Sequence, residues 1–170
     1  MNPEFWFFEQ HEQSKTALIT ENDEPISYSQ LQIDIDKYSQ RLPKSKSLVF
    51  LKVKNTYLTV IAYLACLQNN HPFLPVDDQI DDTLFANLLE KYKPNLIVSE
   101  SNIESYSAFI HEPHSHLAML LSTSGTTGSP KLVRLSHLNL SNNASAIVEY
   151  LQITPNDTVI TTLPMSYSYG

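Results

Sequence analysis

Glycine, cysteine and basic side chains are all scarce in this chain. Its 170 residues include three glycines, where average usage would give about twelve. The single cysteine, Cys66, excludes an internal disulfide framework and fits a reducing compartment. Lys and Arg total 11 against 18 Asp and Glu. This acidic balance argues against a nucleic-acid-binding protein, because neutralising phosphates requires clustered cations.

Long apolar runs are missing as well. The longest one, residues 57–67, is about half as long as a membrane-spanning helix. The first eight residues carry no basic region of the kind that begins a secretory signal peptide. We therefore expect a soluble, cytoplasmic protein. At 42% apolar and 17% charged residues, the composition is that of a globular chain with room for one domain or subdomain.

Short apolar runs alternate along the chain with helix-like segments. The runs that predict strands are residues 16–20, 47–53, 73–76, 95–99, 117–121, 131–135 and 157–163. The segments that predict helices are residues 4–12, 28–42, 56–68, 84–93 and 137–151. Such alternation is typical of an α/β fold with a largely parallel sheet flanked by helices.

Hydroxyl side chains mark the expected beginnings of three helices. Ser27 is followed by Gln30 at the third position, which is the pattern of a capping box. Thr83 and Ser136 precede the apolar faces of two later helices. We therefore predict these three residues as N-caps.

Two of the three glycines lie in one short loop, STSGTTGSPK at residues 122–131, directly after a predicted buried strand. Glycines allow backbone N–H groups to converge on an anion, hydroxyls donate further hydrogen bonds, and Lys131 supplies a positive charge. Residues 113–148 contain no Asp or Glu, while Lys131, Arg134 and His137 lie among them. The pattern predicts a phosphate-binding loop.

The spacing of the loop excludes two common phosphate sites. A Walker loop needs a longer glycine separation followed at once by Lys and Ser or Thr, and here Pro130 precedes Lys131. The dinucleotide-binding pattern needs a third glycine, which the loop lacks. A flexible surface turn rich in Ser, Thr and Gly remains the alternative interpretation.

The same loop resembles the signature loop of the AMP-forming, adenylate-forming enzymes. That superfamily includes acyl-CoA synthetases, luciferase and the adenylation domains of peptide synthetases. Leu132 departs from the pattern, because the family usually has glycine after the lysine. Weaker similarities lie at residues 26–31, 73–77 and 163–170.

The resemblance implies a position within a larger protein. It identifies residues 1–170 as the N-terminal portion of an AMP-binding (adenylation) domain, that is, the first part of the large N-terminal domain of an adenylate-forming enzyme. The rest of that domain and the C-terminal lid domain would then be absent from this chain. The expected consequence is exposed apolar surface and self-association.

The resemblance also implies an activity. A carboxylic acid is activated by ATP as an acyl-adenylate with release of pyrophosphate, and a thiol of CoA or of an acyl or peptidyl carrier protein then displaces AMP. Mg²⁺ would accompany the ATP. A non-catalytic module that retains the phosphate loop without turnover is the alternative function.

By the same resemblance, specific residues receive roles. Lys131 and Thr126 would act in the adenylation step, and Tyr167 would lie beside the acid, although its ring also suits a purely structural role. The residues expected to hold the nucleotide are Ser122, Thr123, Ser124, Gly125, Thr126, Thr127, Gly128 and Lys131.

Two other groups of residues have simpler interpretations. The cluster of His111, Glu112, His114 and His116 is irregularly spaced; we expect a solvated link there rather than the alternative, a metal site. Cys66 lies in an apolar helical segment and is predicted to be a buried, inert thiol.

Overall fold

The computed structural model describes residues 4–100, 102–108, 113–122 and 132–167. The helices are α1 (Tyr28–Ser39), α2 (Tyr57–Gln68), α3 (Asp82–Tyr92) and α4 (His137–Leu151). The strands are β1 (Thr16–Ile19), β2 (Pro25–Ser27), β3 (Val49–Val53), β4 (Phe73–Asp77), β5 (Leu96–Val98), β6 (Ile103–Ser105), β7 (Leu117–Ser122) and β8 (Leu132–Ser136).

The main sheet has the strand order β6-β5-β3-β4-β7-β8. Its four central strands, β5, β3, β4 and β7, are parallel, while β6 and β8 are antiparallel to their neighbours at the two edges. Strands β1 and β2 form a separate antiparallel pair. The predicted α/β fold with a largely parallel sheet is confirmed.

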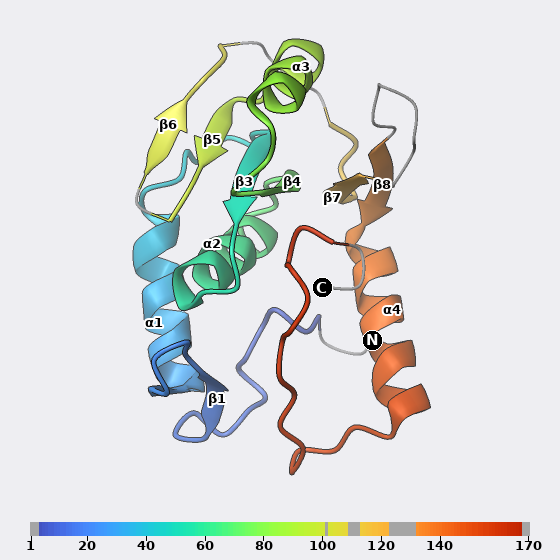
Figure 1. The fold of residues 1–170 in the computed structure, drawn as a ribbon. Helices are drawn as coiled ribbons and strands as arrows, with labels where there is room; N and C mark the ends of the chain where they lie inside the picture. The colour runs from blue at the N-terminus through green and yellow to red at the C-terminus, as the bar shows by residue number, and fades with distance from the viewer. Residues whose placement is uncertain (1–3, 101, 109–112, 123–131, 168–170) are drawn as a thin grey trace.

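Helices cover the sheet on both faces (Figure 1). The side chains of β3 alternate between two apolar clusters, as a strand buried on both faces must. Val49 and Leu51 pack into the cluster with α1 and α2. Phe50 packs into the second cluster, to which α3 contributes Leu88.

The predicted N-caps are correct at two of three helices. Ser27 Oγ accepts a hydrogen bond from the Gln30 N–H at 3.1 Å, and Ser136 forms a reciprocal capping box with Asn139. The prediction of Thr83 is wrong. Asp81 caps α3 instead, because its carboxylate reaches the Leu84 N–H at 3.0 Å and also carries a charge that favours a helix N-terminus.

The helix predicted for residues 4–12 is absent, and turns take its place. Trp6 and Phe8 are both buried in the main core. Residues two apart lie on different sides of a helix, so the burial of both side chains favours an irregular backbone.

The strand predicted for residues 157–163 is also wrong. Among the described residues it has no neighbouring strand, and Val159 and Ile160 are 71% and 82% exposed. A strand needs a hydrogen-bonded partner, and apolar alternation alone does not supply one. The expected exposure of apolar surface is confirmed at these side chains.

No helix among the described residues is long and apolar enough to cross a lipid bilayer.

Candidate functional site

The carboxyl ends of the parallel strands meet at one edge of the sheet. These ends are Val53 of β3, Asp77 of β4, Val98 of β5 and Ser122 of β7. Open α/β sheets bind their ligands at this edge, because the loops there converge and leave a crevice.

A cavity of about 460 Å³ opens at this edge of the sheet. Its floor is residues 74–77 of β4, and Leu84 and Leu88 of α3 form one wall. Pro164, Ser166 and Tyr167 form another part of the lining. The cavity extends to Ser122, the first residue of the predicted phosphate loop. A largely apolar pocket with polar groups at its rim is the usual form of a small-molecule site.

The predicted nucleotide-binding loop connects β7 to β8. Ser122 pairs with Leu132 across this antiparallel pair, so the two ends of the loop lie side by side. The other predicted loop residues, Thr123, Ser124, Gly125, Thr126, Thr127, Gly128 and Lys131, lie outside the described residues.

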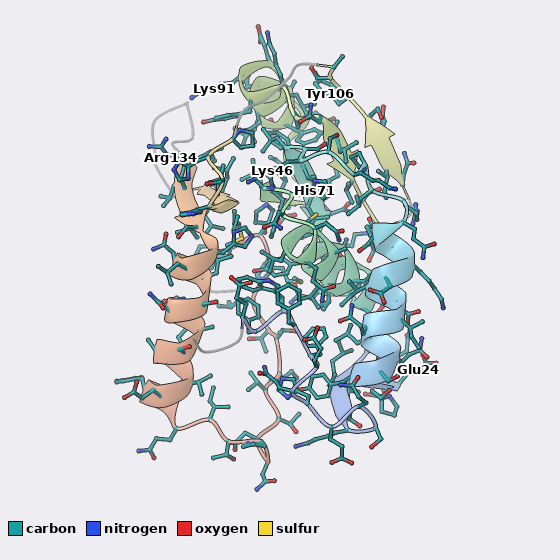
Figure 2. All side chains as sticks on the ribbon, turned by 180° about the vertical axis from the view of Figure 1, so that it is seen from behind. Glu24, Lys46, His71, Lys91, Tyr106 and Arg134 are labelled. Carbon is teal, nitrogen blue, oxygen red and sulfur yellow. The ribbon has the colours of Figure 1, made fainter. Side chains whose placement is uncertain are left out.

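The basic side chain nearest the loop among the described residues of β8 is Arg134. It lies opposite Leu120 of β7, and Figure 2 shows it on β8 above the beginning of α4. Because residues 113–148 contain no carboxylate, this part of the chain adds no negative charge that would oppose a bound anion.

A network of charged side chains joins three of the strand ends. Lys54 Nζ lies 3.3 Å from Asp78 Oδ2 and 3.7 Å from Glu100 Oε2. The hydrogen bond and charge of Asp78 raise the pKa of Lys54. Glu100 also accepts a hydrogen bond from the Thr56 hydroxyl. These contacts fix the ends of β3, β4 and β5 relative to one another.

The segment of residues 163–167 crosses this edge, and side chains at or just after the ends of β3 and β4 hold it there. Asn55 donates to the Leu163 carbonyl at 2.8 Å and accepts from the Met165 N–H at 3.1 Å. The Ser166 hydroxyl donates to Asp77 Oδ2 at 3.2 Å. Tyr167, the predicted substrate-proximal residue, therefore lies on the cavity lining and is half exposed.

The histidine cluster is described only in part. The rings of His114 and His116 lie 5.3 Å apart, whereas His111 and Glu112 lie outside the described residues. Within the part of the chain that the structure describes, no three potential ligands come together as a metal site.

Cys66 is fully buried in α2, as predicted. Its burial raises the pKa of the thiol to about 12. Since the thiolate is the reactive form, this cysteine is a packing residue and not a nucleophile.

Asn55 and Asp77 were not predicted as site residues. A signal was present in residues 73–77, which carry one of the weaker family similarities. Asn55 had no comparable signal, since its partners lie 108 and 110 residues away.

The pattern of the AMP-binding enzyme family matches residues 106–170. Among curated proteins, tyrocidine synthase 2 of Brevibacillus parabrevis is 30% identical over 131 residues, which are 65% of this chain and 4% of that protein. The D-alanine–D-alanyl carrier protein ligase of Streptococcus pyogenes serotype M3 (strain SSI-1) is 28% identical over 149 residues, 72% of this chain and 29% of the ligase. The chain thus spans well under half the length of these relatives.

Solved structures extend the similarity to nearly the whole chain. ATP-bound MatB from Rhodopseudomonas palustris superposes with a TM-score of 0.80 at 21% identity, covering 97% of this chain and 40% of MatB. At this identity the likeness establishes the fold. It includes the regions before residue 106, which the family pattern does not match.

Proposed function

Since the chain has the fold and the loop sequence of the AMP-binding, adenylate-forming superfamily, we propose that it is the N-terminal portion of an enzyme that activates a carboxylic acid as its acyl-adenylate. The proposal assigns residues 1–170 to the adenylation domain of a longer protein. In support, the chain covers 40% of the superposed MatB chain.

One observation carries the proposal: the cavity at the carboxyl ends of the strands extends to Ser122, where the signature loop begins. A nucleotide held by that loop would have its phosphates next to a pocket large enough for a small organic acid. Adenylation needs the phosphates and the acid to lie side by side, because the acid's carboxylate must attack the α-phosphorus of ATP.

The chemical work of this step is chiefly positioning and charge stabilisation. In the proposed site, the glycines and hydroxyls of the 122–131 loop bind the phosphates, and Lys131 offsets the charge of the departing pyrophosphate. Mg²⁺ in triphosphate sites takes few protein ligands, and the hydroxyls of Thr126 and Thr127 fit that need. When bound, the ion would neutralise triphosphate charge.

The second half of the proposed reaction transfers the acyl group to a thiol. The matched relatives include a D-alanyl carrier protein ligase and a probable CoA ligase. We therefore propose a carrier-protein thiol or CoA as the acceptor. The alternative function, nucleotide binding without turnover, makes no use of a thiol.

The test is ATP–pyrophosphate exchange by the full-length protein with a panel of amino, aromatic and aliphatic acids. We expect exchange that depends on one class of acid. Thr126→Val, which removes one loop hydroxyl, should lower it about 100-fold. Thr16→Val, an exposed change on β1, is the matched control and should leave exchange unchanged.

Absence of exchange with every acid would overturn the ligase proposal. If ATP still bound to such a protein, the non-catalytic alternative would be the correct function.

A further inference from the structure

We propose that Asn55 and Asp77 are positioning residues that hold the 163–167 segment across the carboxyl ends of β3 and β4 and thereby set Tyr167 on the cavity lining. The inference rests on the proposed function, because it gives this arrangement a role in binding the acid. The claim that Asn55 and Asp77 hold the segment can be tested whether or not the protein activates an acid.

The Asn55 side chain makes backbone hydrogen bonds of the kind that a neighbouring strand would make. Its amide group donates to Leu163 O and accepts from Met165 N, two backbone groups on residues two apart. A neighbouring strand makes the same kind of paired contact with alternate residues. One side chain thus provides a pairing that no strand among the described residues offers to the 163–167 segment.

The anchor itself is firmly placed. Asn55 lies between Lys54, which is paired with Asp78 and Glu100, and Thr56, the N-cap of α2. Both flanking residues are tied to the ends of neighbouring elements. These contacts restrain the backbone on both sides of Asn55, as a positioning role requires.

Asp77 provides the second attachment. One carboxylate oxygen accepts from the Ser166 hydroxyl at 3.2 Å, and the other accepts from the Gln79 N–H at 2.8 Å. The second bond fixes the carboxylate relative to its own turn. Tyr167 follows directly, and its N–H closes a turn onto the Pro164 carbonyl at 2.9 Å.

The chain that leads to this segment has little other support. Figure 1 shows it, in red, running from the end of α4 back toward the ends of β3 and β4. Val159 and Ile160 on the way are largely exposed. The nearest earlier attachment is the bond of Lys15 Nζ to the Pro155 carbonyl at 2.7 Å. The position of Tyr167 therefore depends on attachments within residues 163–167, which are the contacts with Asn55 and Asp77 together with the packing of Met165 against the main core.

The test uses the full-length protein with Asn55→Ala, and with Asn69→Ala as the matched control. Asn69 is also exposed and makes two side-chain hydrogen bonds, but at the opposite end of α2. We expect Asn55→Ala to speed amide hydrogen exchange at Met165 about tenfold, a factor that matches the loss of one hydrogen bond. Asn69→Ala should leave that amide unchanged.

The kinetic measurement compares KM for the acid with KM for ATP in ATP–pyrophosphate exchange, using the acid that the panel identifies. Asn55→Ala should raise KM for the acid about tenfold and leave KM for ATP within about twofold, because only the acid side is displaced. Asn55→Asp keeps the acceptor for Met165 and loses the donor to Leu163, so its effect should be intermediate. A general loss of stability would not raise KM for the acid while leaving KM for ATP nearly unchanged.

Unchanged exchange at Met165 in Asn55→Ala would overturn the proposal, and so would faster exchange with an unchanged KM for the acid. If Asn55→Ala does not fold, Ser166→Ala removes the Asp77 attachment at the cavity rim and is judged by the same two readouts. If the wild-type protein activates no acid, the proposed function fails, and amide exchange alone decides whether Asn55 holds the segment.

Discussion

His71 is a buried polar residue with a defined hydrogen-bond partner. It is 2% exposed, and its Nδ1 accepts from the Ser47 N–H at 3.1 Å. Burial lowers its pKa below the ordinary 6.5, and nearby Lys46 acts in the same direction; Figure 2 shows the two side chains close together. The folded protein therefore favours the neutral imidazole.

The lowered pKa of His71 makes the stability of the folded protein depend on pH. Below pH 6.5 the unfolded chain takes up a proton that folded His71 resists, so the free energy of unfolding should fall as the pH drops from 7 to 5. The slope for one such group is at most about 1.4 kcal/mol per pH unit. His137, whose pKa is also lowered mainly by burial, adds to the same trend.

Urea denaturation at several pH values checks this prediction. His71→Asn offers an oxygen to the Ser47 N–H but does not titrate, so the pH slope should become shallower than in the wild type. An identical slope in the variant would show that His71 is not responsible.

At the residue scale, local chemistry could be predicted and long-range contacts could not. The caps Ser27 and Ser136 and the buried Cys66 depend on neighbours within a few positions, and the sequence identifies all three. The contacts of Asn55 depend on how α4 returns the chain to the sheet. No local pattern contains that information.

Helix α4 differs from the other helices in its packing. It has no fully buried residue, whereas α2 has seven. Side chains such as Leu138 and Tyr150 are 67% and 86% exposed. Tertiary packing supplies most of the stability of a helix in a protein, so α4 should open locally more often than α2.

Amide hydrogen exchange of this chain tests the difference. We expect the central amides of α4 to exchange at least about tenfold faster than those of α2, because local opening costs less free energy where few apolar contacts are lost. Equal protection in the two helices would contradict this interpretation and would indicate that α4 has a partner in solution.

At the element scale, apolar runs predicted the strands of the parallel sheet because both faces of those strands are buried. The same criterion failed for residues 157–163, where the apolar pattern is present but the part of the chain that the structure describes supplies no neighbouring strand. It also missed β6, whose residues 103–105 are mostly exposed. An apolar pattern indicates which residues are buried. Strand β6 instead forms because its backbone pairs with β5 at the edge of the sheet.

The whole chain exposes apolar side chains in its last third. Ile160 and Val159 are the clearest cases. Exposed apolar surface of this kind favours association, so this chain should self-associate as its concentration rises. Sedimentation velocity over a hundredfold range of concentration would detect the change in mass.

Ile160→Asp should weaken this association at least about tenfold, because a carboxylate would have to lose water at the contact. Ile19→Asp is the matched control, since Ile19 is 56% exposed but lies on β1, and it should associate as the wild type does. A monomer at every concentration would contradict the expectation.

At the scale of the molecule, the sequence predicted the α/β class and a phosphate-binding loop directly after a buried strand, and Ser122, where that loop begins, is the last residue of β7. It did not predict the cavity, because the cavity forms between β4, α3 and residues 164–167, and each contributes apolar side chains that look like ordinary core. The central claim is that the loop that begins at Ser122, on the cavity lining, binds ATP.

Calorimetric titration of Mg·ATP into the full-length protein tests that claim most directly. Lys131→Ala should weaken ATP binding about tenfold or more, since a charge-assisted contact to phosphate is lost. Lys37→Ala, an exposed change on α1 where Lys37 pairs with Asp34 at 3.4 Å, should bind as the wild type does. Equal ATP affinity in Lys131→Ala and the wild type would contradict the account.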